Sequence, residues 1–397
     1  MINAFKQYQA QTTPHPLGLE ISHAKESYIY TTDGKAHLDF VAGVSACNLG
    51  HCHPEIVKSI QEQAKQYLHV MVYGEYILKP ALELSQKLAE FLPKPLEQTY
   101  LVNSGTEAID ASIKLARRAT GRRQIISAKN CYHGNSYGAL SLMDYHERTA
   151  PFKPLLPAVT QIEFNNTECL QFITKHTAAV ILETIQGGGG FIMPENNYLK
   201  KVKVRCEEVG ALLILDDIQP GFGRTGKLFG FEHFEVVPDI LVIGKAMASG
   251  MPIGALVASK EMMTLLSNNP KLGHITTFGG HPVIAAAGLR TLEILTETDI
   301  IEKVSEKEEL IRNHLKHPLI EEIRGKGLML ALIMKDLEIA NELVLNAKEQ
   351  QLILFWLLYE KRAVRITPPL NISNKDLLKG CETIINILNT IKTKRKC

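Results

Sequence analysis

Apolar runs and amphipathic segments alternate through the middle of the chain. Six short runs rich in aliphatic residues predict strands, at residues 99–102, 124–128, 179–183, 211–215, 239–243 and 253–258. Helical patterns lie between several of these runs, most clearly at residues 106–120 and 196–210. Nearly continuous apolar strands separated by helices are typical of a mostly parallel sheet that is covered on both faces. The pattern therefore predicts an α/β fold for this region.

The pattern changes near residue 282, beyond which long amphipathic helices dominate. Two apolar runs interrupt them, LMLALIM at residues 328–334 and LILFWLL at residues 352–358. These features predict a smaller α+β domain. A chain of 397 residues is also longer than one hydrophobic core usually serves. We therefore expect an N-terminal segment 1–57 that joins the small domain, a large domain 58–295 and a small C-terminal domain 296–397.

Charge, cysteine usage and hydropathy argue against several classes of protein. With 44 Lys+Arg against 42 Asp+Glu, the net charge of +2 gives no electrostatic footprint for nucleic acid. No stretch approaches the roughly 18 unbroken apolar residues of a membrane span, and no signal-peptide core is found at the start. The seven cysteines are dispersed without a CxxC spacing, which favours a reducing compartment. His51 and His53 are read as part of a turn, so no metal site is predicted. We expect a cytoplasmic protein.

One glycine-rich motif nearly matches a nucleotide-binding loop. GFGRTG at residues 221–226 fits G-x-G-x-x-G and follows a predicted strand, as in nicotinamide-dependent oxidoreductases. Such a site needs a helix that begins at the glycines, whereas KLFGFEHFEVVPD is a poor helix opening. For a P-loop, Leu228 stands where Ser or Thr would bind magnesium. An oxidoreductase is therefore kept only as the remote alternative.

The motif NSGTEAIDASIKLAR, residues 103–117, joins a predicted strand to a predicted helix. Ser104, Gly105 and Thr106 open that helix. Free backbone N–H groups and the helix dipole favour an anion at such a position. The same residues are equally well explained as an ordinary N-cap with Glu107 in the first turn.

Two charged residues follow predicted strands and are expected to face one crevice. Asp216 ends an apolar strand, where a carboxylate must be paired or protonated; a pyridinium N–H, a metal or a loop cap would each suffice. Lys245 follows the next strand and is flanked by small residues. A lysine held there can lose its proton and act as a nucleophilic amine. Together they predict a site that contains an amine and a carboxylate.

A series of motifs resembles the class-III aminotransferases, the family of ornithine, acetylornithine and 4-aminobutyrate aminotransferases. In chain order the motifs are LDFVAGVSACNLGHCHP, NSGTEA, YHG, ETIQGGGG, LDDIQPGFGRTG, IGKAMASG, TTFGGHP and VRITPPL. The resemblance covers nearly the whole chain. It implies a fold-type-I transferase that uses pyridoxal 5′-phosphate (PLP) and moves an amino group from a donor of ornithine, acetylornithine or ω-amino acid type to a 2-oxo acid.

The resemblance also assigns roles to individual residues. Lys245 would form the Schiff base with PLP and move the proton, and Asp216 would pair with the pyridine nitrogen. Thr277 would reach the phosphate from the partner subunit, so a homodimer with shared sites is implied. Arg365 would bind the substrate carboxylate, since a guanidinium matches a carboxylate bidentately. The cofactor-binding positions implied are Ser104, Gly105, Thr106, Tyr132, Glu183, Asp216, Gln219, Lys245 and Thr277.

The chain departs from the family pattern in the motif ETIQGGGG. Thr184 stands where the family often has proline, and Gly188 where it often has a second glutamate. In ornithine-type members that glutamate neutralises the carboxylate-binding arginine while an ω-amine donor is bound. Here Arg365 lacks that partner, and we expect Gly188→Glu to improve ornithine-like donors. Alternatives within the same fold are a PLP aminomutase and a decarboxylating transaminase. No role is assigned to the segment around Trp356.

Overall fold

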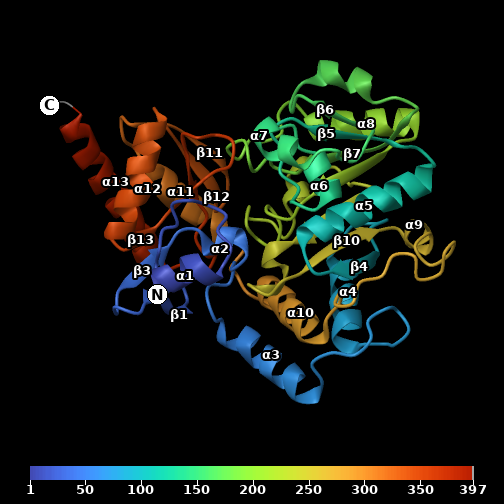
Figure 1. The fold of residues 1–397 in the computed structure, drawn as a ribbon, viewed down its shortest axis with the longest axis horizontal. Coiled ribbons are helices and arrows are strands. Elements are labelled where there is room, and N and C mark those ends of the chain that lie inside the picture. The colour runs from blue at the N-terminus through green and yellow to red at the C-terminus, as the bar shows by residue number, and fades with distance from the viewer. Residues whose placement is uncertain (396–397) are drawn as a thin grey trace.

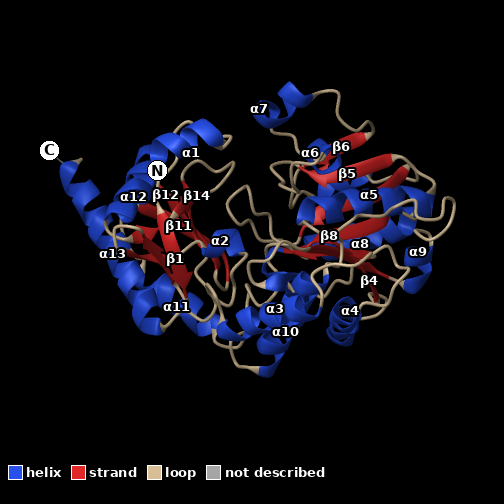
Figure 2. Ribbon diagram, turned by 60° about the horizontal axis from the view of Figure 1, so that its bottom comes forward, coloured by secondary structure: helices blue, strands red, loops and turns tan. Residues whose placement is uncertain are grey.

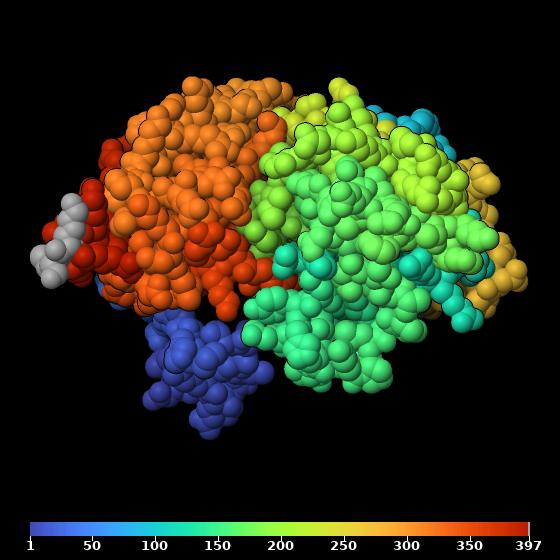
Figure 3. Space-filling view, turned by 90° about the horizontal axis from the view of Figure 1, so that it is seen from above, coloured from blue at the N-terminus to red at the C-terminus, as the bar shows by residue number. Residues whose placement is uncertain are grey.

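The computed structural model describes residues 1–395 and consists of two lobes (Figure 1). The larger lobe contains the central part of the chain, and the smaller lobe contains both termini. Figure 3 shows the C-terminal part packed directly against the large lobe, with N-terminal residues projecting from the surface. Lys396 and Cys397, the last of the seven cysteines, lie outside the described residues.

A seven-stranded sheet forms the centre of the large lobe. Its strands, in spatial order, are β4 (Gln98–Val102), β10 (Gly254–Ala258), β9 (Ile240–Gly244), β8 (Leu212–Asp216), β7 (Thr177–Glu183), β5 (Gln124–Ala128) and β6 (Val159–Ile162). β10 runs antiparallel to both of its neighbours, and all other neighbouring pairs are parallel. The predicted mostly parallel sheet and α/β class are confirmed. The prediction missed β6, whose sequence VTQI is short and half polar.

Capping residues in the sequence mark where helix α5 (Gly105–Thr120) of the large lobe begins and ends. The helix has Ser104 as its N-cap and ends at Gly121, which has a left-handed φ of 68°. Its buried face of alanine, isoleucine and leucine packs across the central strands of the sheet. The other helices are α3 (Pro54–Gln66), α4 (Lys79–Phe91), α6 (Tyr137–Ser141), α7 (His146–Thr149), α8 (Tyr198–Val209), α9 (Lys260–Thr264) and α10 (Pro282–Glu297).

The small lobe contains two four-stranded sheets with helices on the outside (Figure 2). One consists of β1 (Ile21–Lys25), β2 (Tyr28–Thr31), β3 (Ala36–Asp39) and β13 (Leu352–Ile353). The other consists of β11 (Ile320–Lys326), β12 (Met329–Met334), β15 (Ala363–Ile366) and β14 (Phe355–Trp356). The helices are α1 (Ile2–Tyr8), α2 (Ala42–Ser45), α11 (Val304–His314), α12 (Leu337–Glu349) and α13 (Asn374–Lys394).

The apolar run at residues 352–358 divides between these two sheets. β13 pairs in parallel with β3, which brings N-terminal and C-terminal strands into one sheet. β14 pairs antiparallel with β15, and Phe355 lies opposite Arg365. Only the buried Leu354 separates the two strands. The run therefore links the sheet that contains the N-terminal strands to the strand that contains Arg365.

The motif GFGRTG forms a sequence of turns, and no helix begins at its glycines. Arg224 of this motif is fully buried, and its guanidinium donates to the carbonyl oxygen of Leu328 (3.0 Å). It also donates to the carbonyl oxygen of Pro368 and to the side chain of Asn48. Arg224 thus ties a turn of the large lobe to N-terminal and C-terminal segments. This arrangement leaves no helix N-terminus there for a dinucleotide, as the oxidoreductase alternative requires.

Candidate active site

A cavity of about 450 Å³ lies at the carboxyl ends of the central strands, where open α/β sheets bind ligands. Glu183 and Asp216 are the last residues of β7 and β8, and Lys245 follows β9 directly. The small lobe closes the opposite side with residues of β14 and β15. Eight of the ten residues predicted from the sequence line the cavity: Gly105, Thr106, Tyr132, Glu183, Asp216, Gln219, Lys245 and Arg365.

Lys245 enters the cavity from a strained backbone position. Its φ of +47° lies in the left-handed region, which costs a non-glycine residue on the order of 1 kcal/mol. The residue is surrounded by protein and is open only toward the cavity. Burial lowers the pKa of its amine to about 8, and the nearby Arg365 guanidinium acts in the same direction. A substantial fraction of this lysine is therefore neutral near pH 8 and able to act as a nucleophile.

Asp216 is held by two hydrogen bonds at the end of β8. One carboxylate oxygen accepts from the backbone N–H of Ile218 (3.1 Å), and the other lies 2.7 Å from Nδ1 of His133. Burial opposes a charge on His133, but the Cys131 thiol and the Asp216 carboxylate together raise its pKa well above the usual value. The imidazole is therefore placed to donate to Asp216 and to orient this carboxylate beside the cavity.

Glu183 lies beside Asp216 and organises the neighbouring loops. Its carboxylate accepts the backbone N–H groups of Gly187 (2.9 Å) and Tyr132 (3.1 Å). Burial raises its pKa to about 7. The bond to Tyr132 fixes the loop that presents the tyrosine side chain to the cavity. Gln219, on the loop after β8, lies within 3.4 Å of the Ser45 hydroxyl.

The N-terminus of α5 forms the anion-binding end of the cavity. Ser104 lies just outside the lining, and its hydroxyl caps the N–H of Glu107 (3.4 Å). Gly105 and Thr106 present the first turn of the helix to the cavity, where N–H groups have no partner within the helix. A Cβ at Gly134 would come within 2.3 Å of the Thr106 hydroxyl, so only glycine allows this loop to approach. The geometry fits a phosphate.

Arg365 lies on the small-lobe side of the cavity, on β15. It is 5% exposed, and its Nε and Nη1 atoms have no hydrogen-bond partner among the residues described. The GGGG turn after β7 brings Phe191 beneath it, with the guanidinium carbon 5.6 Å from the ring centroid. Burial alone lowers the pKa of Arg365 to about 10, which leaves it charged at neutral pH. A buried, unpaired guanidinium at a cavity wall is suited to binding a carboxylate.

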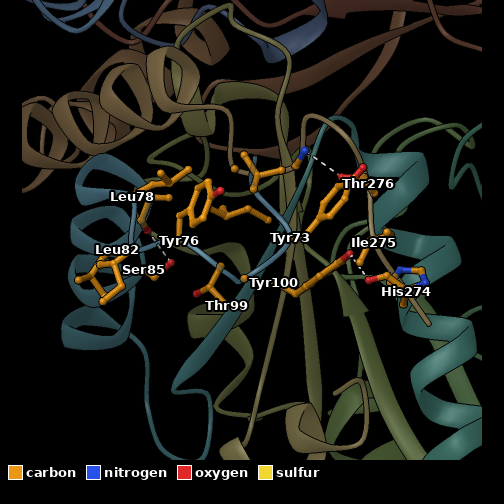
Figure 4. Close-up of a pocket in the computed structure, with 17 residues that line it drawn as sticks. Tyr73, Tyr76, Leu78, Leu82, Ser85, Thr99, Tyr100, His274, Ile275 and Thr276 are labelled. Carbon is orange, nitrogen blue, oxygen red and sulfur yellow. Dashed lines mark hydrogen bonds between the residues drawn. The ribbon is translucent and has the colours of Figure 1, made fainter. Parts of the chain in front are cut away.

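Thr277, like Ser104, is a predicted site residue that does not line this cavity. It is exposed on the loop between α9 and α10. Its neighbour Thr276 lines a separate groove of about 370 Å³ on the surface (Figure 4). Tyr73, Tyr76 and Tyr100 contribute aromatic rings to that groove.

His51 and His53 lie outside the cavity as well. Nε2 of His51 is 2.8 Å from the carboxylate of Asp39, a partner that the sequence analysis did not expect. His53 precedes the first turn of α3. Within residues 1–395, no group of three or more His, Cys, Asp or Glu residues could hold a metal ion.

The family model for aminotransferase class-III matches residues 8–388. The chain belongs to the class-III aminotransferase family. The acetylornithine aminotransferase of Caldanaerobacter subterraneus subsp. tengcongensis is 36% identical over 378 residues, which cover 92% of this chain and 93% of that protein. The ornithine aminotransferase of Toxoplasma gondii, whose crystal structure has PLP at partial occupancy in the active site, superimposes with a TM-score of 0.91 at 28% identity and covers 100% of this chain and 95% of its own.

A transaminase of the marine bacterium Virgibacillus has the same fold, with a TM-score of 0.92, 24% identity and 99% of each chain covered. The expected family, fold and cofactor are therefore confirmed. Enzymes of this class are PLP-dependent aminotransferases, and this chain is one of them. No helix within residues 1–395 is long and apolar enough to cross a membrane.

The residues of this class-III aminotransferase fit PLP. The N-terminus of α5 is suited to the phosphate, the carboxyl group of Asp216 to the pyridine nitrogen and the neutral form of Lys245 to the aldehyde. The buried Nε2 of His133 has no partner among the described residues, and Asp216 lines the cavity. These groups belong to the large lobe, and Arg365 faces the same cavity from β15 of the small lobe.

Sequence reasoning missed several residues that shape this site. His133 stands in the motif YHG directly after Tyr132, but its partner Asp216 is distant in the chain. Val44, Ile185, Phe355, Trp356 and Leu358 form an apolar part of the lining. Val44 has a φ of +60°, unusual for a β-branched residue. A sequence gives no direct sign of these contacts, because each joins segments that only the tertiary fold brings together.

Proposed function

We propose that this aminotransferase transfers the amino group of a donor of ornithine, acetylornithine or ω-amino acid type to a 2-oxo acid. One observation carries the proposal: a desolvated lysine amine, a hydrogen-bonded carboxylate and an unpaired guanidinium face one cavity. The cofactor needs the first two groups, and a carboxylate substrate needs the third. Two similar proteins are named as an acetylornithine aminotransferase and an ornithine aminotransferase, which supports a donor of this type.

Each charged residue of the cavity has a separate role. When bound, PLP supplies an electron sink that stabilises negative charge on the substrate carbon. Lys245 would hold the cofactor, and its free amine would move the proton between the substrate carbon and the cofactor. A pKa of about 8 suits this role, because the amine exchanges its proton readily near neutral pH. Asp216, hydrogen-bonded to His133, would pair with the ring nitrogen. Arg365 orients the substrate by its carboxylate.

The experiment that tests this function is a mass balance. Purified enzyme with PLP is incubated with each amino donor and a 2-oxo acid, and the keto product and new amino acid are quantified. We expect one equivalent of each product. Rearranged amino acid without keto product would indicate an aminomutase, and carbon dioxide release would indicate a decarboxylating transaminase. No nitrogen transfer from any donor would contradict the proposal.

We also propose a homodimer whose partner subunit contributes Thr277 to the phosphate end. Residues of segments 72–78 and 274–280 line the groove of Figure 4, and large apolar side chains are exposed on and beside these loops. The exposed residues there are Leu68, Tyr76, Ile77, Leu272, Ile275 and Phe278. A patch of this kind marks an association surface, and a second copy would place the exposed Thr277 against its neighbour.

Subunit mixing tests the shared site. Inactive Lys245→Ala chains and impaired Thr277→Ala chains are mixed, and subunit exchange is verified by mass spectrometry. Activity should recover, because a hybrid dimer rebuilds one sound site from two chains. Light scattering of Ile77→Glu should give monomers, whereas the control Phe152→Glu, exposed elsewhere on the large lobe, should remain dimeric. A dimeric Ile77→Glu variant would place the interface on another face.

We propose that residues 1–57 act with the C-terminal domain 296–397, because β3 pairs with β13, and that residues 58–295 form the PLP-binding domain. Limited proteolysis should cut in the turns after α10, residues 298–303, before it cuts within the large sheet. The six described cysteines are free thiols, which supports a cytoplasmic location. Subcellular fractionation checks the latter.

A further inference from the structure

Arg365 differs from the buried carboxylates of the cavity because two of its nitrogen atoms, Nε and Nη1, have no hydrogen-bond partner among the described residues. The carboxylates that line the cavity are Glu183 and Asp216, and both are engaged by hydrogen bonds at the cofactor end. Among the described lining residues, Lys245 and Arg365 are the only Lys or Arg side chains. A substrate anion therefore meets one guanidinium, and Lys245 is reserved for the cofactor. Donor and acceptor must use Arg365 in turn.

The ring of Tyr359 occupies the space that a carboxylate side chain would need at Gly188, in the turn at residues 187–190. This ring covers Gly188, so a Cβ at that glycine would lie 2.5 Å from a ring carbon. The tyrosine is held at both ends: its N–H donates to the carbonyl oxygen of Gly188 (3.0 Å) and its hydroxyl to that of Cys131 (3.0 Å). Because a side chain at residue 188 would overlap this ring, the turn has glycines and no carboxylate there to neutralise Arg365.

The wall beside Arg365 is apolar. Phe355, Trp356 and Leu358 line it from the small lobe, and Val44 and Ile185 complete it. The polar edge of Trp356 points elsewhere, because its indole N–H donates to the side chain of Asn341 in α12 (2.8 Å). The cavity therefore meets the hydrocarbon surface of the indole. A second charge on a substrate would lose its hydration against this wall and gain no partner.

We propose that the enzyme selects substrates with a single carboxylate and an uncharged apolar substituent in both half-reactions. Arg365 binds the carboxylate of the donor and of the 2-oxo acid, and the substituent packs against Phe355 and Trp356. The inference rests on the proposed transamination and narrows it. Within the proposed donor types, it favours short amino acids that have one carboxylate over donors with a second ammonium group. It likewise favours monocarboxylate 2-oxo acids over 2-oxoglutarate.

Binding of unreactive carboxylates tests the selection without turnover. The PLP-loaded enzyme is titrated calorimetrically with 5-methylhexanoate and with glutarate, which differ in an isopropyl group against a carboxylate of similar shape. We expect 5-methylhexanoate to bind at least tenfold more tightly. Equal binding, or tighter binding of glutarate, would overturn the inference.

Variants of the wall identify the residues responsible. Phe355→Ala and Trp356→Ala should each weaken 5-methylhexanoate at least fivefold and leave propanoate, which has no substituent to pack, unchanged. Phe355 is 41% exposed, so its variant should fold even if Trp356→Ala does not. The control Phe152→Ala, an exposed aromatic of the large lobe, should bind all three ligands as the wild type does. Unaltered 5-methylhexanoate binding in a folded Phe355→Ala variant would contradict the assigned wall.

Turnover separates this inference from the function it rests on. We compare kcat/KM for leucine and 3-amino-5-methylhexanoate with pyruvate against that for ornithine with 2-oxoglutarate. Preference for the first group supports the inference. Preference for ornithine and 2-oxoglutarate would overturn it and leave the aminotransferase function intact. If no pair transfers nitrogen, the proposed function fails, whereas the calorimetric result still decides the binding preference.

Discussion

The two ends of the cavity treat their charged groups in opposite ways. At the cofactor end, Asp216 and Glu183 each accept two hydrogen bonds from protein groups. At the substrate end, Arg365 is as deeply buried but has two nitrogen atoms without any partner among the described residues. A resident cofactor allows its site to be organised permanently. A substrate that enters and leaves must itself supply the missing interaction, so the substrate end is left unsatisfied.

The largest effect is expected at Lys245. Lys245→Ala removes both the amine that carries PLP and the group that moves the proton, so kcat should fall by about 10⁴-fold or more. Borohydride treatment of the wild-type enzyme should fix the cofactor on the peptide that contains Lys245. Label found on another lysine, or measurable multiple turnovers in Lys245→Ala, would remove Lys245 from the site.

Asp216→Asn should cost about a hundredfold in kcat with little change in KM, because a neutral amide cannot hold the ring nitrogen protonated. His133→Gln is the matched comparison, since it removes one hydrogen bond and leaves the carboxylate. Its loss should be smaller, and steady-state kinetics of both variants measure the difference. Equal losses would mean that the hydrogen bond, and not the charge, is what matters.

Arg365→Met removes the unpaired guanidinium that distinguishes the substrate side of the cavity from the cofactor side. Substrate carboxylates should bind about 30-fold more weakly or worse, because the one guanidinium that receives them is gone. The free energy of unfolding of the apoenzyme should rise by about 1 kcal/mol, because a buried unpaired charge is replaced by an apolar side chain. Calorimetric binding and urea denaturation measure the two effects. A destabilised Arg365→Met protein would show that Arg365 has an internal partner after all.

Loading of the apoenzyme with PLP should depend on pH through Lys245. The folded-state pKa of about 8 lies below the usual lysine value, so the neutral, nucleophilic amine gains population as the pH rises through 8. The rate of covalent loading should increase about tenfold between pH 7 and 9 and then level off. Stopped-flow absorbance follows it. A rate that still climbs steeply above pH 9.5 would mean that Lys245 titrates like an exposed lysine.

The smallest effect concerns packing at Gly188. Gly188→Ala should lower the free energy of unfolding by about 1–3 kcal/mol, because its Cβ would overlap the ring of Tyr359. In Gly188→Ala/Tyr359→Ala the added methyl group should cost far less than it does beside the intact tyrosine. A double-mutant cycle in urea measures this coupling. Additive effects would show that the ring and residue 188 do not compete for space.

Much of this molecule could be predicted from short stretches of sequence. Apolar runs located the strands of the large sheet, and charged residues at their ends located Asp216 and Lys245, because strand ends meet at one edge. The prediction was weaker where structure depends on distant partners. The run LILFWLL contains no sign that β13 and β14 belong to different sheets, since backbone pairing with β3 and β15 decides this.

The reason for Gly188 was also beyond the sequence. Motif comparison indicated a missing glutamate, and the expected test was to restore it by Gly188→Glu. The structure shows that Tyr359, which is far along the chain, occupies the space such a side chain would need. A glutamate there requires that this ring move first. The position is therefore a matter of volume as well as charge, and only the tertiary contact reveals it.

The chain encodes its two chemistries in separate places. Phe355, Trp356, Leu358 and Arg365 all lie within residues 355–365, whereas the lining residues of the same cavity that are suited to the cofactor lie between residues 105 and 245. Substitutions that retune the preferred donor can accumulate in the first stretch without passing through an enzyme that has lost PLP. For protein engineering, a library of variants at residues 355–358 could be screened for new substrates while the residues suited to the cofactor stay unchanged.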